Sequence, residues 1–145
     1  MNALSSLKAR LLVVSDLEHS ASLLHWDQTT YMPPGGAEAR GRQIALLSKM
    51  AHEQFTDPEV GTLLDQAERE TSGLPFESDE ASLVRITRRL WDQEVRVPSS
   101  LVAEQREHAA RSYQAWIVAR PANDFESMRP EKAATGPCTG KASRT

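Results

Sequence analysis

Histidine and glutamate side chains offer the first chemistry to examine in this sequence. Residues 52–56, His-Glu-Gln-Phe-Thr, begin like the zinc signature HExxH. In that signature two histidines four residues apart share one helix face, and the glutamate acts as a base. Here the second histidine is replaced by Thr56, so one metal ligand is missing. We therefore interpret His52 and Glu53 as part of a solvated helix end.

The other three histidines form no usable metal pair by their spacing. His19 and His25 are six residues apart, which does not place them on one face of a helix. His108 lies in the charged stretch 104–111 and is expected on a solvated helical face. The single cysteine, Cys138, has no recognisable nucleophile setting. The sequence thus predicts no catalytic residue and no metal or other cofactor bound by this chain.

A polar cluster comes directly before a forced corner in residues 23–40. His25, Trp26 and Asp27 precede two prolines and two glycines, residues 33–36. Prolines push the residue before them out of the helical region, and the glycines permit backbone angles closed to other residues. The structural interpretation is that Trp26 anchors the corner in the core, while His25 and Asp27 bond free backbone groups at the helix end. The alternative is that His25 or Asp27 borders a substrate groove.

Apolar residues recur at three- and four-residue steps through most of the chain, which predicts helices. We expect helices over residues 2–28, from about 37, from 56 to 72, over 78–95 and from 99 to 119. No convincing strand is found, so the predicted fold is all-α, with about five amphipathic helices in an irregular array. The residues expected to face the core include Ile44, Leu47, Met50, Ala51, Val60, Leu63, Leu64, Ala67, Leu83, Ile86, Leu90, Trp91, Val102, Ala109, Tyr113, Trp116 and Ile117.

The start of the third expected helix carries a capping signal. Thr56 is followed by Asp57 and Pro58, and Glu59 comes three residues after the threonine. This pattern predicts that Thr56 caps the helix and that Glu59 reaches back to it.

Composition divides the chain of 145 residues into two parts. Residues 1–128 form the predicted helical region. Residues 129–145 contain no large apolar side chain and are expected to be a disordered tail. The formal net charge of −3 offers no basic field for nucleic acid, and no apolar run is long enough for a membrane span. One cysteine fits a reducing, cytoplasmic location.

Residues 23–65, LLHWDQTTYMPPGGAEARGRQIALLSKMAHEQFTDPEVGTLLD, closely resemble the N-terminal part of the thermostable (Taq-type) metallocarboxypeptidases. The stretch VPSSLVAE at 97–104 agrees with the same family. The residues of the family fingerprint, structural or groove-lining, are His25, Trp26, Asp27, Met32, Pro33, Gly36 and Arg40.

The resemblance implies an all-helical fold with a deep groove and a zinc- or cobalt-dependent enzyme that removes C-terminal residues from peptides. It also implies a cytoplasmic homodimer. The HExxH motif and the other metal ligands of the family lie downstream of the region seen here, and the sequence departs from the family pattern after Pro130. We therefore expect this chain alone to be inactive, as the leading section of a shortened carboxypeptidase.

The alternative is a non-enzymatic helical interaction or oligomerisation module. Leu4, Leu7, Leu11 and Val14 have near-heptad spacing, which suits a partner helix, although the polar Glu18 interrupts the next position. The partner would be a second copy or the missing C-terminal portion, and missing partners would leave apolar surface exposed.

Overall fold

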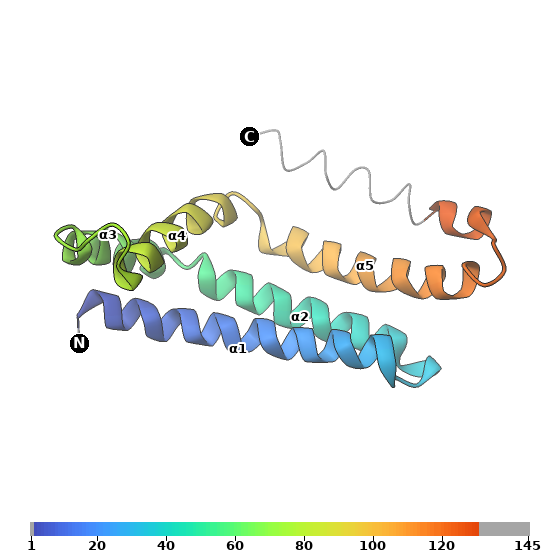
Figure 1. Cartoon of the computed structure of the whole chain (residues 1–145). Coiled ribbons are helices and arrows are strands. Elements are labelled where there is room, and N and C mark those ends of the chain that lie inside the picture. Colours follow the sequence, from blue (N-terminus) through green and yellow to red (C-terminus); the bar gives the residue numbers. More distant parts are fainter. Residues whose placement is uncertain (1, 131–145) are drawn as a thin grey trace.

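The computed structural model describes residues 2–130, and in that part every regular element is helical (Figure 1). The elements are α1 (Ala3–Thr30), the short 3-10 helix η1 (Pro34–Gly36), α2 (Ala37–Phe55), α3 (Pro58–Thr71), α4 (Asp79–Glu94) and α5 (Ser99–Ala119). Residues 125–130 are helical as well. The all-α prediction is therefore confirmed. Apart from residues 129 and 130, which are helical, the predicted tail lies outside the described residues.

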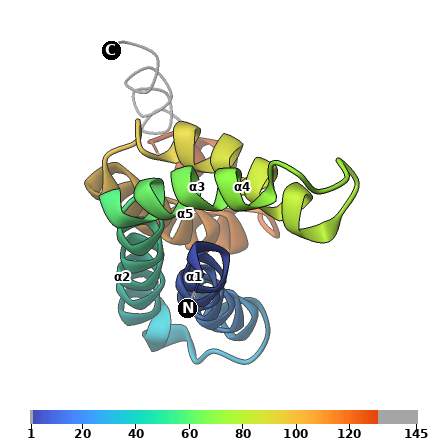
Figure 2. The same ribbon diagram turned by 90° about the vertical axis from the view of Figure 1, so that its left-hand side faces the viewer.

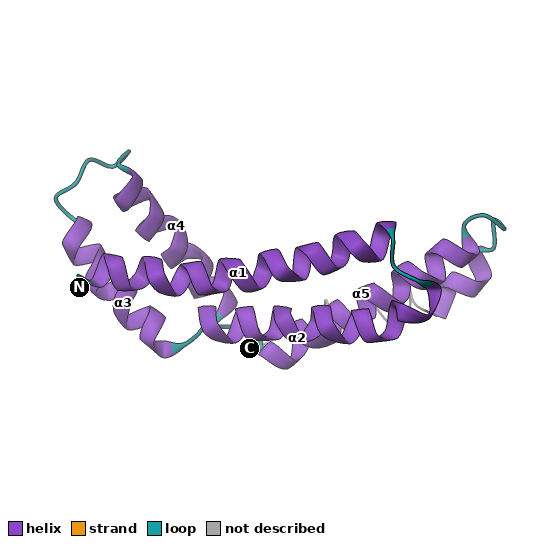
Figure 3. Cartoon of the chain, turned by 90° about the horizontal axis from the view of Figure 1, so that it is seen from below, coloured by secondary structure: helices purple, strands orange, loops and turns teal. Residues whose placement is uncertain are grey.

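The helices form an elongated array (Figures 1 and 3). α1 and α2 are antiparallel neighbours, and α5 packs along α2. α3 packs on the beginning of α1, and α4 packs on α3, so these two helices sit at one end of the molecule, which faces the viewer in Figure 2. None of the helices in residues 2–130 is long and apolar enough to cross a membrane.

Burial along α1 follows a repeat of seven residues. Leu7, Val14, Ala21 and Gln28 are all buried, each two helical turns after the last. At the start of this stripe Leu7 meets the main hydrophobic cluster, which is completed by residues of α3 and α4. Its other members are Val60, Leu64, Ala67 and Val84.

The N-terminus of α1 is capped from two directions. The Asn2 side chain accepts a hydrogen bond from the N–H of Ser5 at 2.9 Å. The Glu70 carboxylate, at the end of α3, accepts from the N–H groups of Ala3 and Leu4 at 2.8 and 3.1 Å. A negative charge at this position also suits the positive end of the helix dipole. α1 is thus attached to α3 by polar as well as apolar contacts.

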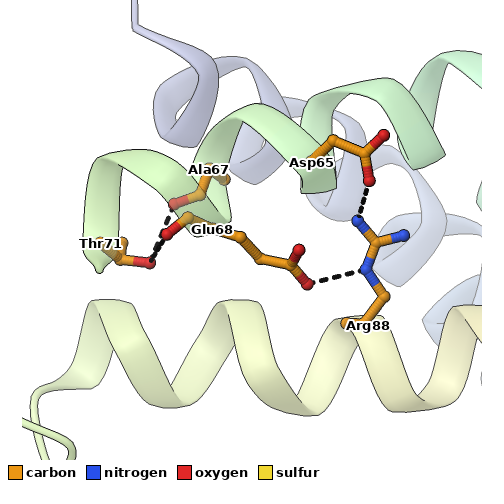
Figure 4. Close-up of polar contacts among 5 residues, drawn as sticks. All are labelled: Asp65, Ala67, Glu68, Thr71 and Arg88. Carbon is orange, nitrogen blue, oxygen red and sulfur yellow. Dashed lines mark hydrogen bonds and ion pairs between the residues drawn. The ribbon is translucent and has the colours of Figure 1, made fainter.

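α3 and α4 are joined by close packing and by a double ion pair. An added Cβ on Gly61 would lie 2.7 Å from the Trp91 ring, so only glycine allows this approach. Arg88 of α4 donates to Glu68 at 2.8 Å and to Asp65, both on α3 (Figure 4). Burial alone would lower the pKa of Arg88, but the hydrogen bonds and negative charges of Glu68 and Asp65 raise it above its ordinary value.

The prediction that Thr56 caps α3 is wrong. Thr56 ends α2, where its hydroxyl donates to the His52 carbonyl at 2.8 Å. The residue that caps α3 is Asp57, whose carboxylate accepts from the N–H of Glu59 at 2.8 Å. Asp57 is one position closer to α3 than Thr56. It caps α3 because the Thr56 hydroxyl is already bonded to the His52 carbonyl of α2.

The predicted apolar stripes of α4 and α5 are only partly buried. α4 buries Val84 and Thr87, the face that meets α3, while α5 buries Leu101 and Ala110, among others, on the face that meets α2. Each helix is covered on one side only, so apolar positions on its other side stay in solvent. The residues predicted to be buried but found exposed are Met50, Ile86, Leu90, Ala109, Trp116 and Ile117.

Candidate functional site

The corner between α1 and α2 is held by backbone hydrogen bonds at the end of α1. The N–H groups of Tyr31 and Met32 both donate to the Asp27 carbonyl, at 3.1 and 3.0 Å. Pro33 then takes an extended backbone conformation, with φ −60° and ψ 146°, and ends the helix. The N–H of Gly36 donates to the Pro33 carbonyl at 2.9 Å, which closes the single turn of η1. The prediction of a corner at this position is confirmed.

Two fingerprint residues, Asp27 and Arg40, meet across this corner. Arg40 Nη1 on α2 lies 2.5 Å from Asp27 Oδ2 on α1. The same guanidinium donates to the carbonyl of Leu24 at 3.2 Å. Both charged side chains are partly shielded from solvent, so the pair is stronger than a fully exposed one. Asp27, the acidic residue of the cluster 25–27, therefore helps to fix the angle between α1 and α2.

Met32 and Gly36 also come together, for a reason different from the predicted one. We expected the glycines to supply unusual backbone angles, but no described glycine has a positive φ, and Gly36 has φ −82°. Instead, an added Cβ on Gly36 would lie 3.1 Å from Met32 Cγ. The lack of a side chain at Gly36 leaves room for the Met32 side chain, which packs against it.

The prediction that Trp26 anchors the corner in the core is wrong. Its side chain is 55% exposed and makes an edge contact with Tyr31, whose ring centroid is 6.1 Å away. The buried face of α1 includes Gln28. Trp26 comes two residues earlier, which is about 200° around the helix, so its side chain points away from the buried face. His25 is exposed too, with its ring 6.4 Å from that of Tyr113 on α5.

A groove runs along the described helices, between α1 and α5 and over α2. Its larger part has a volume of about 890 Å³ and is lined by residues of α1, α2, α4 and α5. Its smaller part, about 390 Å³, is lined by α1, α2 and α5 and includes His25 and Tyr113. Glu18, Ser48, Arg106 and Ala109 line both parts, so the two are continuous. Of the fingerprint residues, His25 alone is among the residues lining this groove.

His52 lines the larger part of the groove, and its predicted place at a solvated helix end is wrong. Its side chain is buried, with Nδ1 2.9 Å from Ser99 Oγ and Nε2 3.1 Å from the Glu94 carbonyl. A carbonyl can only accept, so Nε2 donates to it, and the serine hydroxyl, which can donate or accept, pairs with Nδ1. His52 thereby joins the end of α2 to the end of α4 and the start of α5.

His108 is likewise buried, although its neighbours in the sequence are charged. It lies on the face of α5 that also carries the buried Leu101, and its Nε2 is 3.4 Å from Ser112 Oγ. The expectation of a solvated face is therefore wrong for this residue, because within the charged stretch 104–111 His108 and Ala110 are buried while the other positions are exposed.

Three polar side chains of the groove that sequence reasoning did not assign to a site are Glu18, Gln28 and Arg106. The available signal was the spacing of α1, because Glu18 and Gln28 occupy later positions of the same seven-residue repeat as Leu11 and Val14. Within residues 2–130, Gln28 Nε2 is buried without a hydrogen-bond partner.

The described residues do not fit a catalytic metal. Within residues 2–130 no three His, Cys, Asp or Glu side chains are grouped so that they could hold one. Both ring nitrogens of His52 are already engaged. The groove therefore offers a shaped and partly polar surface without a group of metal ligands among residues 2–130.

Comparison with known proteins gives one consistent family. The profile of the carboxypeptidase Taq (M32) metallopeptidases matches residues 6–135. Thermostable carboxypeptidase 1 of Thermus thermophilus is 35% identical over 111 residues, which cover 75% of this chain and 21% of that protein. The protein of the same name from Pyrococcus furiosus is 28% identical over 117 residues, 77% of this chain and 22% of the relative.

A solved structure shows the same arrangement of helices. The M32 carboxypeptidase from Deinococcus radiodurans R1 aligns with a TM-score of 0.67 and 35% identity, over 97% of this chain and 28% of that one. This chain thus spans about a fifth to a quarter of the length of its relatives. With a profile match over most of its length, the chain belongs to the carboxypeptidase Taq (M32) metallopeptidase family.

Proposed function

We propose that this chain is the N-terminal helical section of a metal-dependent carboxypeptidase that releases C-terminal amino acids from peptides, and that it is inactive on its own. The observation that carries the proposal is the family match over residues 6–135, in a chain whose alignment covers only 21% of the Thermus thermophilus relative. Hydrolysis of this kind needs a metal with an open coordination position and a general base. The described residues provide no group of metal ligands.

In this proposal the N-terminal section has a structural role in the enzyme. The Asp27–Arg40 pair fixes the angle of α1 and α2, and the groove beside them presents His25 and Arg106 to whatever packs there. The metal, zinc or cobalt, is held by residues of the family that follow the matched section. The cytoplasmic location and the homodimeric state implied by the resemblance belong to the same proposal.

A chimera tests this proposal directly. Residues 1–130 of this chain replace the matched N-terminal section of the Thermus thermophilus relative. We expect the chimera to release C-terminal amino acids from peptides when zinc or cobalt is present, and to lose this activity with a chelator. The isolated 145-residue chain and the relative without its N-terminal section are expected to release nothing under the same conditions.

Two results would contradict the proposal. One is a chimera that folds cooperatively and binds metal but does not cleave peptides. The other is metal-dependent release by the isolated chain, which would mean that its own residues form a catalytic site.

A further inference from the structure

The groove is lined by three helical stripes that share one spacing. On α1 the lining positions Leu11, Val14, Glu18, Ala21, His25 and Gln28 follow one another in alternating steps of three and four residues, with Ser15 and Ser22 beside them. Steps of three and four average 3.5 residues, the spacing by which helices of left-handed bundles present side chains to a partner helix. Val14, Ala21 and Gln28 of this stripe are already buried, whereas Glu18 and His25 are exposed, so the open edge of the stripe is available to pack against another helix.

The other two walls repeat the pattern. On α2 the lining includes Ile44, Ser48, Ala51 and Phe55, and on α5 it includes Val102, Arg106, Ala109 and Tyr113, again in steps of three and four residues. α1 and α5 each pack mainly on α2, and the groove separates their lining faces. Three helices arranged in this way form a four-helix bundle that lacks one member.

From this arrangement we propose that the groove is the docking site for an amphipathic helix from the part of an M32 carboxypeptidase that follows the matched section. This inference rests on the proposed function. The stripe of α1 extends from Leu11 to Gln28, so at 1.5 Å per residue it spans roughly 26 Å, or about five turns of helix. The relatives are about three and a half times as long as this chain, since the match covers 97% of this chain but only 28% of the Deinococcus radiodurans protein, which leaves ample further sequence in the family.

The polarity of the groove indicates the chemistry of its occupant. Towards α4 the lining combines apolar side chains, such as Leu11, Phe55 and Leu90, with the polar Thr87 and Glu94. At its middle Glu18 and Arg106 line both parts, and no ion pair within residues 2–130 joins one to the other. At the corner end Gln28 has a buried amide nitrogen without a partner. The occupant is therefore an amphipathic helix, with apolar side chains at the levels of Leu11 and Phe55 and hydrogen-bonding groups at the levels of Glu18 and Gln28.

Ala109 gives a clean test because it is exposed in the isolated chain yet lines both parts of the groove. The variant Ala109→Glu places a charge in the groove without disturbing the existing core. Ala9→Glu is the matched control, since Ala9 is also an exposed helical alanine but lies outside the groove lining. The probe is the Thermus thermophilus relative without its matched N-terminal section, titrated with the 145-residue chain in isothermal titration calorimetry.

We expect binding by the unmodified chain, a loss of roughly tenfold or more in affinity for Ala109→Glu because a charge becomes buried, and no change for Ala9→Glu. In the chimera, Ala109→Glu should lower the melting temperature by several degrees, whereas in the isolated chain it should barely change it. Equal effects of the two variants on binding and on the chimera would overturn the proposal.

Two further outcomes separate the possible occupants. If the isolated chain self-associates in sedimentation velocity and Ala109→Glu abolishes this, the groove holds a second copy and the proposal fails. If peptide substrate alone protects the groove from hydrogen exchange in the isolated chain, the occupant is a peptide and the proposal fails as well. If the chimera is inactive but is still destabilised by Ala109→Glu, the proposed function is refuted and the proposed docking of a helix in the groove is supported.

Discussion

Asp27 Oδ2 on α1 and Arg40 Nη1 on α2 lie 2.5 Å apart, and the same guanidinium also reaches the carbonyl of Leu24. The pair spans a corner in which proline and a single 3-10 turn reverse the chain. One side chain of α2 thus holds both a carboxylate and a backbone group of α1.

Replacing Arg40 by methionine should lower the free energy of unfolding by about 1–2 kcal/mol, because both interactions are lost in a partly shielded place. Urea denaturation of the isolated chain measures this. Arg42→Met is the control, since its ion pair with Glu38 is exposed, and it should change stability by less than about 0.5 kcal/mol. In a double-mutant cycle with Asp27→Asn, strictly additive losses would show that the pair contributes nothing.

Gly61→Ala should destabilise the contact between α3 and α4. Alanine normally favours a helix over glycine by about 1 kcal/mol, but here its Cβ would lie 2.7 Å from the Trp91 ring. We expect a net loss of about 1–2 kcal/mol from overpacking, measured by thermal and urea denaturation.

Gly73→Ala is the matched control, because nothing lies within 4 Å of its added Cβ and its φ is not positive. It should change stability by less than about 0.5 kcal/mol. Combining Gly61→Ala with Trp91→Phe should cost less than the two losses added together, since the smaller ring makes room. If Gly61→Ala stabilises the chain, the helices are not packed as closely as described.

His52→Phe should lower stability by about 1–3 kcal/mol although it keeps an aromatic ring at this position, because Ser99 Oγ and the Glu94 carbonyl each lose a partner near the groove. His19→Phe, at an exposed position of α1, is the control and should have little effect. Hydrogen exchange should show faster opening at the start of α5 in the His52 variant. Unchanged exchange there would mean that His52 does not hold that junction.

The sequence predicted the helices well because their signals are local. These signals each act within a few residues: the spacing of Leu7 and Val14, the prolines at the corner, and the polar residues before Pro58. The burial of His52 could not be predicted in this way. Its partners, Glu94 and Ser99, are more than forty residues distant, so nothing near His52 in the sequence identifies them.

The wrong burial predictions on α4 and α5 have a common physical cause. An amphipathic pattern shows that a face such as that of Ile86 and Leu90 is suited to burial, but it does not say which element covers it. Within residues 2–130, α3 covers one side of α4 only. Leu90 instead lines the groove, where we propose that a further helix packs.

Arg88→Lys is expected to loosen α4 from α3. The arginine fork bonds Glu68 and Asp65 at once, and a lysine ammonium cannot reproduce this geometry (Figure 4). The acids are largely exposed, so we expect a modest loss of about 0.5–1 kcal/mol in urea denaturation at low salt. The loss should shrink in about 1 M salt, where exposed charges are screened.

Arg89→Lys provides the control from the neighbouring position, which is exposed and forms no ion pair within the described chain. It should leave stability unchanged at both salt concentrations. Because α4 is attached to the described helices mainly through α3, loosening this pair should also speed hydrogen exchange in α4 more than in α5. Equal acceleration in both helices would mean that α4 and α5 open as one unit, contrary to the packing described.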